Sequence, residues 1–480
     1  MRFYDSRIAA SMITLAAMTL PAEGFAVEQS DTLVLSLDRC IEIALSDNPT
    51  IKVADMEITR TDYSKKEVLG QLFPTISFGG SYSRTLAKQT MYMNMDGFGG
   101  MGGGDSEGDE DAPAEDSPMS RGGGGNGIKV GLDNSYQVGF NASMPLIAPQ
   151  LWKSLKLSDT QILQNIESAR ASRLSLVNQV KNAYYTLLLA MDSRDVIQES
   201  YDMARFTADL YARQFELGAA TKYDVLRTEV AVKNIEPELS QAEISIKQAR
   251  LQLLVLMGMD AMIPLRPDVT LSEYESTMYE QALGLTRDIS GNTDLKMLDL
   301  QTRSLNDALS IQKASWYPTL ALTASYNWTS MNNGTPFSNL RWNPYSMVGV
   351  TLSFPLFEGG QRYYKVKQAQ VQVNEMAFQR ENLERALRMQ VDVSIDNINT
   401  NVKQIASCSE SVKQAEVPHD IVKQSFEIGA ATYLQLRDGE LALTQARLAY
   451  YQAIYNYLVA NSELEYLLGT HDVSASMPAR

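Results

Sequence analysis

The chain has 480 residues, a formal net charge of −15, and only two histidines and two cysteines. An acidic chain repels phosphate backbones, so this charge argues against a nucleic-acid partner. Because His419 and His471 are the only imidazoles, most acid–base and zinc chemistry is removed from consideration.

The first segment, residues 1–26, has the pattern of a secretory signal peptide. Arg2 and Arg7 supply a positive start, residues 8–20 an apolar core, and residues 24–26 a small-residue cleavage site. Beyond it, no apolar run approaches the ~18 to 20 residues that a membrane-spanning helix needs. We therefore expect an exported chain that is either soluble or crosses a membrane as a β-barrel. Cys40 and Cys408 lie far apart on helix-patterned segments, and we expect them to stay unpaired.

The mature sequence repeats itself in three places. The paired segments are 71–78 with 315–322, 139–146 with 349–356, and 215–221 with 426–432. We therefore expect an internal duplication, with a first structural repeat over 27–260, a second over 261–470 and a tail over 471–480. Each repeat is predicted to run helix, strand, strand, long helix, helix.

Helical periodicity opens each repeat. It covers residues 37–72 and ends before Pro74, because proline cannot continue the hydrogen-bond ladder. Its counterpart covers about 279–316, before Pro318. Within these segments Asn48-Pro49-Thr50-Ile51 corresponds to Asn292-Thr293-Asp294-Leu295 as a helix start.

Strict alternation of apolar and polar residues then predicts four strands, each with one apolar and one polar face. The apolar positions are Ile76, Phe78 and Tyr82; Val138, Phe140, Ala142 and Met144; Leu320, Leu322, Ala324, Tyr326 and Trp328; and Val348, Val350, Leu352 and Phe354. A soluble sandwich shows the same alternation, but the small hydroxylic polar face and the aromatic residues at the strand ends favour a membrane barrel. Four strands cannot close a barrel, so oligomerisation must supply the rest. We expect Pro74, Pro145, Pro318 and Pro355 to mark the junctions between helices and strands.

The segment 88–133, between the first two strands, is rich in glycine and acid, and we expect a disordered surface loop. Residues 97–102 match a dinucleotide fingerprint only formally, because the strand–turn–helix context is missing. Residues 105–111 resemble alternating calcium ligands but carry Glu110 where the loop requires glycine, and Met91, Met93 and Met95 are soft ligands suited to Cu(I). A solvated tract is the favoured interpretation, and no metal, cofactor or catalytic residue is expected.

Two long helices, about 146–216 and 356–427, show the 3-4 apolar spacing of coiled coils. They turn at Gly218, Ala219, Ala220 and Thr221, and at Gly429, Ala430, Ala431 and Thr432, and return as helices over 223–257 and 433–468. Asp224 and Asp438 follow the turns. In a symmetric assembly each would form an acidic ring that favours cations. The alternative is a solvated acid stabilised by the positive end of its helix.

As an ordered, duplicated set, the helix starts, the four prolines and the two Gly-containing turns resemble the TolC-like outer membrane efflux protein family. The resemblance implies a mixed α and β fold, with a trimeric 12-stranded transmembrane β-barrel, four strands per chain, continued by a long α-helical coiled-coil periplasmic tunnel. It implies a location in the outer membrane of a Gram-negative bacterium, in contact with outer-membrane lipid.

The same resemblance implies a passive exit duct of a tripartite efflux pump or type I secretion system, with no enzymatic activity. Its partners would be a periplasmic adaptor, docking at the two turns, and an inner-membrane transporter. The family's aperture acids carry over to Asp224 and Asp438, whereas Gln435 stands where another aperture acid would lie and Ala431 where some members place an arginine. The rival hypothesis is a secreted periplasmic coiled-coil scaffold or adhesin without a pore.

Overall fold

The computed structural model describes residues 33–91, 128–276, 278, 285–471 and 473. The expected signal peptide and most of the expected tail lie outside these residues. The chain divides into two compact units: unit 1 comprises residues 1–47, 179–281 and 401–459, and unit 2 comprises 48–178, 282–400 and 460–480.

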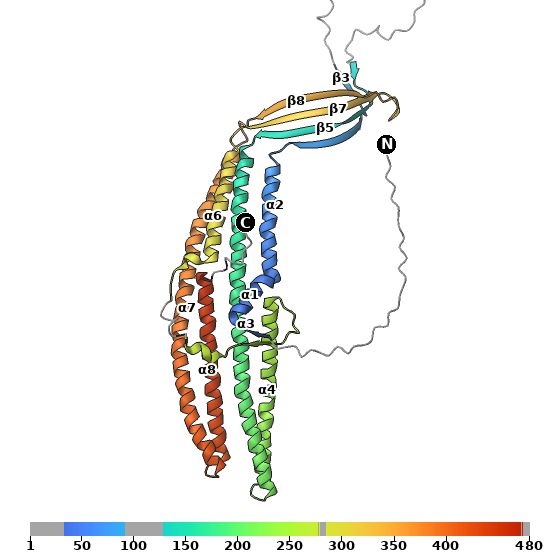
Figure 1. Ribbon diagram of the computed structural model, residues 1–480. Coiled ribbons are helices and arrows are strands. Elements are labelled where there is room, and N and C mark those ends of the chain that lie inside the picture. Colours follow the sequence, from blue (N-terminus) through green and yellow to red (C-terminus); the bar gives the residue numbers. More distant parts are fainter. Residues whose placement is uncertain (1–32, 92–127, 277, 279–284, 472, 474–480) are drawn as a thin grey trace, which may run out of the picture. The chain divides into compact units, whose positions relative to one another are not determined.

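Unit 2 carries a four-stranded sheet (Figure 1). Its strands are β2 (Thr75–Arg84), β5 (Asn134–Ile147), β7 (Thr319–Asn332) and β8 (Asn343–Ser353), in the order β2–β5–β7–β8. Every neighbouring pair is antiparallel. The four predicted strands are therefore present, and β2 and β8 are the two edges.

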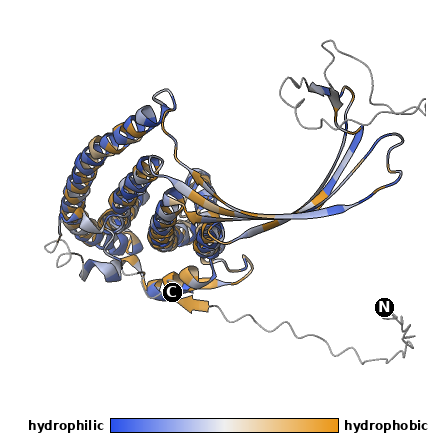
Figure 2. Cartoon of the chain, turned by 90° about the horizontal axis from the view of Figure 1, so that it is seen from above, coloured by the Kyte–Doolittle hydropathy of each residue, from blue (hydrophilic) through white to orange (hydrophobic). Residues whose placement is uncertain are grey.

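The register places apolar residues on one face of the sheet and polar residues on the other. Phe78, Phe140 and Tyr326 lie in one cross-strand row, and Ser77, Asn141 and Ser325 lie in the adjacent row on the other face. The alternation is visible along the strands in Figure 2. The only charged residue in these four strands is Arg84, the last residue of β2. The predicted two-faced strands are thus confirmed.

The helix expected over 37–72 is interrupted. It consists of α1 (Leu37–Asp47) and α2 (Pro49–Gly70), because Asn48 adopts an extended conformation and caps α2 by accepting a hydrogen bond from the Thr50 amide at 2.7 Å. Its counterpart, α6 (Thr293–Ala314), begins after Asn292, which accepts a hydrogen bond from the Leu295 amide at 3.0 Å. Both asparagine helix starts are confirmed.

The four prolines do not all mark junctions. Pro74 and Pro318 directly precede β2 and β7, as expected. Pro145 lies inside β5, beyond the last residue paired with β2, Ser143, so its missing N–H removes no bond on that side. A register shift lies between Pro145 and Ile147, and helix α3 (Pro149–Glu216) begins later than residue 146.

Pro355 is also separated from its helix. Helix α7 (Gln361–Glu427) starts six residues after Pro355, because Gly359 and Gly360 have φ values of +59° and +83° and turn the chain first. Arg362 ties this segment together by donating hydrogen bonds to the Pro355 carbonyl at 2.8 Å and to the Glu358 carboxylate at 2.9 Å.

The loop expected to be disordered over 88–133 has ordered ends. Strand β3 (Gln89–Met91) pairs antiparallel with β4 (Ile128–Val130), so the prediction is wrong there. Each of these strands has only three residues, too few to show a period in the sequence, and they are held by pairing with each other. The dinucleotide-like, calcium-like and remaining methionine motifs lie outside the described residues.

The return helices are α4 (Lys222–Met257) and α8 (Tyr433–Leu468). They end at Gly258 and Gly469, whose φ values are +70° and +64°, as expected of helix C-caps. Within the long helices, residues at the predicted 3-4 spacing are buried, notably Tyr184, Leu187 and Ile398. Among the described residues, no helix combines the length and the apolar character needed to cross a membrane.

Unit 1 contains elements that the sequence did not indicate. Strand β1 (Leu33–Leu35) pairs in parallel with β6 (Leu265–Pro267), followed by the 3-10 helix η1 (Leu271–Tyr274). Near β6, the Tyr184 hydroxyl donates a hydrogen bond to the Asp268 carboxylate at 2.9 Å.

Two smaller features complete the fold. In unit 2 a second 3-10 helix, η2 (Ile289–Gly291), precedes α6. Cys40 and Cys408 are both free thiols.

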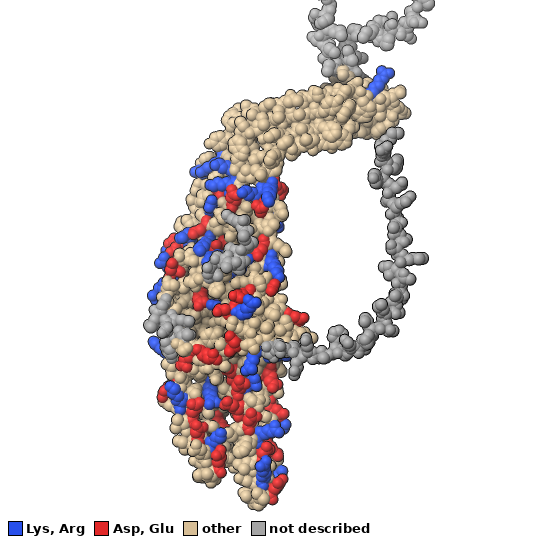
Figure 3. Space-filling view, in the orientation of Figure 1, with Lys and Arg blue, Asp and Glu red and all other residues tan. Residues whose placement is uncertain are grey.

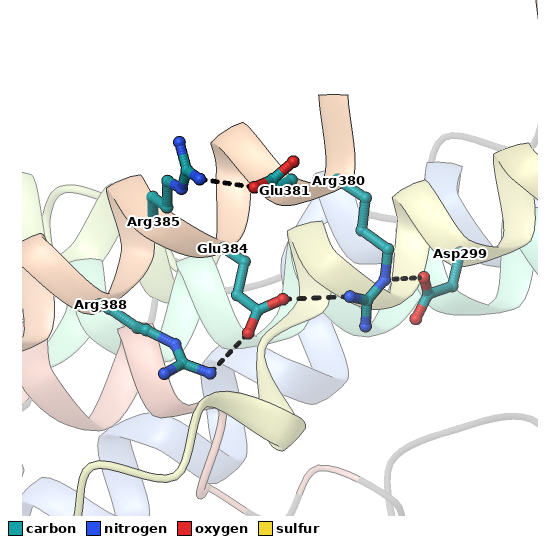
Figure 4. A network of polar contacts seen from close by, with 6 residues as sticks. All are labelled: Asp299, Arg380, Glu381, Glu384, Arg385 and Arg388. Carbon is teal, nitrogen blue, oxygen red and sulfur yellow. Dashed lines mark hydrogen bonds and ion pairs between the residues drawn. The ribbon is translucent and has the colours of Figure 1, made fainter. Parts of the chain in front are cut away.

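An ion-pair network links α6 to α7 within unit 2 (Figure 4). Arg380 on α7 donates to Asp299 on α6 at 2.8 Å and to Glu384 at 3.1 Å, and Glu384 also accepts from Arg388 at 2.5 Å. These groups are largely exposed, so each pair contributes only about 0–1 kcal/mol.

Candidate functional site

The two hairpin turns, both in unit 1, have the same backbone design. After α3, Gly218 has φ +75°, and the Ala219 amide donates to the Gln214 carbonyl at 2.7 Å. After α7, Gly429 has φ +75°, and the Ala430 amide donates to the Ser425 carbonyl at 2.7 Å. This bond pattern closes a helix end and requires a left-handed residue, which explains the glycine at each turn.

Each turn is followed by a threonine that caps the next helix. Thr221 Oγ1 accepts a hydrogen bond from the Asp224 amide at 3.2 Å, and the Asp224 carboxylate accepts from the Thr221 amide at 3.2 Å. Thr432 and Gln435 make the same exchange, with the Gln435 side-chain oxygen accepting from the Thr432 amide at 2.9 Å. Gln435 therefore keeps the capping role of Asp224 and loses its charge.

The first turn holds its acid in the ionised form. Hydrogen bonds from the Thr221 side chain and backbone, aided by the charge of Arg227, lower the pKa of Asp224 below its usual range. Asp438, six residues after the Thr432 cap, is exposed. The Asp224 carboxylate accepts hydrogen bonds from the amide and the hydroxyl of Thr221. Among the described residues, Asp224 and Asp438 are not brought together by a hydrogen bond.

An aromatic cluster joins the two hairpins beside these caps. The guanidinium of Arg227, on α4, lies 5.0 Å from the ring centroid of Tyr433, the first residue of α8. The Tyr433 ring also contacts Tyr211 of α3, with centroids 6.0 Å apart, and Tyr211 lies 6.3 Å from the ring of Phe426 on α7. Sequence reasoning missed this cluster. Its signal was an arginine one turn after Asp224 and an aromatic residue directly after the second turn.

A cavity of about 660 Å³ lies farther along unit 1, among α3, α7 and α8. Arg447 crosses it, making ion pairs to Glu199 at 2.6 Å and Glu416 at 2.9 Å. Glu440 also lines it, and burial raises the pKa of Glu440 to about 7, opposed by the charge of Lys423. One carboxylate oxygen of Glu440 is buried without a hydrogen-bond partner.

The described residues offer little to a metal ion or to covalent chemistry. No group of three or more His, Cys, Asp or Glu side chains in the described ranges is arranged to hold a metal. Buried Cys40 has its pKa raised to about 12 by desolvation, which opposes formation of the nucleophilic thiolate.

Comparison with known proteins identifies the class. A model of the outer membrane efflux protein family matches residues 40–259 and 286–470, and the chain belongs to this family. It is similar to outer membrane protein TolC of Vibrio cholerae, with 22% identity over 335 residues, covering 69% of this chain and 76% of that protein. It is also similar to the alkaline protease secretion protein AprF of Pseudomonas aeruginosa, with 24% identity over 362 residues, covering 72% and 74%.

Solved structures show the same fold. The Campylobacter jejuni CmeC outer membrane channel superposes with a TM-score of 0.66 at 16% identity, over 92% of this chain and 88% of that chain. The Vibrio cholerae outer membrane protein VceC gives 0.66 at 15% identity, over 90% and 96%. The chain is thus an outer-membrane exit duct of efflux or secretion systems, extending into the periplasm, and is not an enzyme. A scaffold without a pore does not fit this family.

Proposed function

We propose that three copies of this chain close a twelve-stranded barrel in the outer membrane, continued by a periplasmic helical tunnel. The open edges of the four-stranded sheet carry this proposal. Edge strands β2 and β8 have 10 and 11 residues and are almost entirely exposed in one chain. Unpaired backbone groups are not tolerated in lipid, so both edges need partners.

The strand directions suit closure by identical copies. Three antiparallel steps lead from β2 to β8, so these two edges run in opposite directions. The β8 edge of one copy can therefore pair antiparallel with the β2 edge of the next. An all-antiparallel closed barrel follows from repeating the unit.

The helices have lengths that suit a tunnel built from two equivalent halves. Helices α3 and α7 have 68 and 67 residues, roughly 100 Å each at 1.5 Å per residue, and α4 and α8 have 36 residues each. The order α2, β2, β5, α3, α4 is matched by α6, β7, β8, α7, α8. These parallels support the division into repeats over 27–260 and 261–470.

The aperture would lie at the hairpin turns. In a trimer, Asp224 and Asp438 would each form a ring of three carboxylates that favours cations, while Gln435 would form a neutral ring. TolC-like efflux channels work with adaptor proteins and inner-membrane pumps in tripartite systems. The turns Gly218–Thr221 and Gly429–Thr432 are the surfaces on which adaptor contact would open the channel.

A matched pair of substitutions tests the barrel. Val350 lies on the apolar face of β8, paired with Leu322, and its neighbour Thr351 lies on the polar face. A lysine facing lipid costs about 2–4 kcal/mol at mid-membrane, whereas a lysine facing the lumen is tolerated. Val350→Lys should therefore abolish the detergent-resistant trimer, measured by light scattering after extraction, and Thr351→Lys should retain it. Equal tolerance of both, or a monomeric parent protein, would contradict the proposal.

A second pair tests the aperture. Replacing Asp224 and Asp438 with Ala should raise single-channel conductance and weaken cation preference in planar bilayers, because the carboxylate rings are removed. Asp396→Ala removes an exposed acid of α7 far from the turns in sequence and serves as the control. Conductance unchanged from the parent would exclude the gating role.

A further inference from the structure

Exposed lysines and aromatic rings border the sheet of unit 2 at its helical end. We call them the collar: Lys153, Lys365, Lys367, Trp152, Trp316 and Tyr363, all exposed. On the visible face in Figure 3, Lys and Arg side chains gather where the helices meet the sheet, while the sheet is almost free of charge. The collar therefore marks an abrupt change from uncharged strands to basic helix ends.

The collar lysines lie close to the N-terminal ends of two helices. Lys153 and Lys365 are the fifth residues of α3 and α7, and neither helix has an acidic residue in its first turn. The positive end of a helix dipole favours negative charge. An external anion beside these ends would therefore be favoured by the helix ends as well as by the lysines.

Two of the three collar lysines have no acidic partner in the part of the chain that the structure describes. Lys153, Lys365 and Lys367 make no ion pair among the described residues, but the pKa of Glu358 is lowered by a hydrogen bond from Arg362 and by the charges of Arg362 and Lys365. Nearby lysines are paired: Lys156 with Asp307 at 3.0 Å, and Lys65 with Asp159 at 2.6 Å. Lys367 lies over the ring of Tyr363, 5.6 Å from its centroid. The ammonium groups of Lys153 and Lys367 are thus left for an external anion, and that of Lys365 is shared with Glu358.

The two collar tryptophans lie close in sequence to the ends of two strands. Trp316 lies three residues before β7, and Trp152 lies five residues after β5. The two residues are 49% and 50% exposed. Tryptophan and tyrosine concentrate at the level of lipid headgroups, and lysine side chains extend from apolar surface to reach charged groups at that level. Position and charge together fit the phosphates of a lipid surface.

We propose that the collar binds the headgroup phosphates of anionic phospholipids in the periplasmic leaflet of the outer membrane. The inference rests on the proposed membrane-spanning role of the four strands. Anionic lipid is favoured over zwitterionic lipid because only the former leaves a net negative charge to be matched by the ammonium groups.

Quenching of tryptophan by brominated lipid tests the proposal on the full chain. Trp328→Phe and Trp342→Phe leave Trp152 and Trp316 as the reporters. Two reconstituted bilayers are compared: dilute brominated phosphatidylglycerol in phosphatidylcholine, and dilute brominated phosphatidylcholine in phosphatidylglycerol. From the quenching, the brominated phosphatidylglycerol should bind beside these reporters about fivefold more strongly than the brominated phosphatidylcholine. Addition of 0.5 M salt should weaken this preference. The variant K153A/K365A/K367A should lose it. The control K247A/K403A/K413A, which removes three exposed lysines of unit 1, should keep it.

The outcomes separate this inference from the channel itself. Equal quenching by both lipids, with parental single-channel conductance, overturns the collar and leaves the channel intact. If neither brominated lipid quenches the reporters and no conductance is measured, both the lipid site and the proposed channel are overturned. Reversal of the preference by millimolar inorganic phosphate would assign the site to free anions and overturn the lipid assignment.

Discussion

The guanidinium of Arg227 stacks on the ring of Tyr433, 5.0 Å from its centroid, and so joins α4 of the first hairpin to α8 of the second. Tyr433 is partly buried, and burial raises its pKa. Arg227 also lowers the pKa of Asp224. One arginine therefore contacts both hairpins and adds to the Thr221 hydrogen bonds that lower the pKa of Asp224, in a chain that has Ala431 where some relatives are expected to carry a tip arginine.

Removing this arginine should loosen the closed aperture. A cation–π contact contributes about 0.5–2 kcal/mol, depending on its desolvation. We expect Arg227→Ala to raise the open probability in planar bilayers, with Arg227→Lys intermediate because it keeps the charge and loses the planar stacking group. Arg213→Ala removes an exposed arginine in the last turn of α3 and provides the control. If both alanine variants open equally often, the stacking does not hold the aperture shut.

Gln435 should accept an acid without losing its capping role. Its side-chain oxygen accepts a hydrogen bond from the Thr432 amide at 2.9 Å, just as the Asp224 carboxylate accepts one from the Thr221 amide at 3.2 Å. We expect Gln435→Asp to increase cation selectivity, measured as the reversal potential in a salt gradient, with no loss of thermal stability. Gln435→Ala should lower stability by about 1 kcal/mol through the lost cap. Unaltered selectivity in Gln435→Asp would place this side chain outside the ion path.

The ion pair between buried Arg173 and half-buried Asp55 of α2 should contribute more to stability than an exposed ion pair on α2. Arg173 has no exposed surface, and it donates to both carboxylate oxygens of Asp55 at 2.7 and 2.9 Å. Leaving a buried charge uncompensated costs about 3–5 kcal/mol, whereas an exposed pair contributes about 0–1 kcal/mol. Asp55→Ala should therefore lower the melting temperature clearly more than Asp62→Ala, which breaks the exposed pair with Lys66. Similar losses would show that Arg173 is stabilised by its other contacts.

Much of the fold could be predicted because it is encoded in local periodicity. The alternation around Phe78 and Phe140 gave the strands, the 3-4 spacing around Tyr184 gave the long helices, and Gly218 and Gly429 gave the turns. Each of these signals depends on neighbours in sequence. The junction at Pro145 was misplaced. Pairing of β5 with β2 ends at Ser143, before this proline, but pairing of β5 with β7 continues past it to Ile147.

The contacts at the candidate site depend on packing between hairpins distant in sequence. Arg227 and Tyr433 are separated by more than 200 positions, and no periodic pattern connects them. Residue identity indicated Asp224 and Gln435 as counterparts, but only the hydrogen bonds show that both act as caps. The environment of Glu440 likewise depends on three helices that enclose it.

Glu440 should make stability depend on pH. Its pKa is raised from 4.5 to about 7 by burial, so the ionised form is disfavoured in the folded chain relative to the unfolded one. The stabilising contribution of the protonated group is complete below about pH 4.5 and is lost as the pH rises to about 7. Glu440→Gln removes this dependence. Its melting temperature should equal the parent's at pH 4.5 and exceed it at pH 8, by an amount corresponding to on the order of 2 kcal/mol.

The control for this effect is Glu238→Gln, an exposed glutamate of α4, which should track the parent at every pH. Lys423→Ala provides an independent check, since the charge of Lys423 opposes the rise in the pKa of Glu440. Its removal should move the loss of stability to higher pH. A transition that persists unchanged in Glu440→Gln would show that Glu440 does not cause the pH dependence.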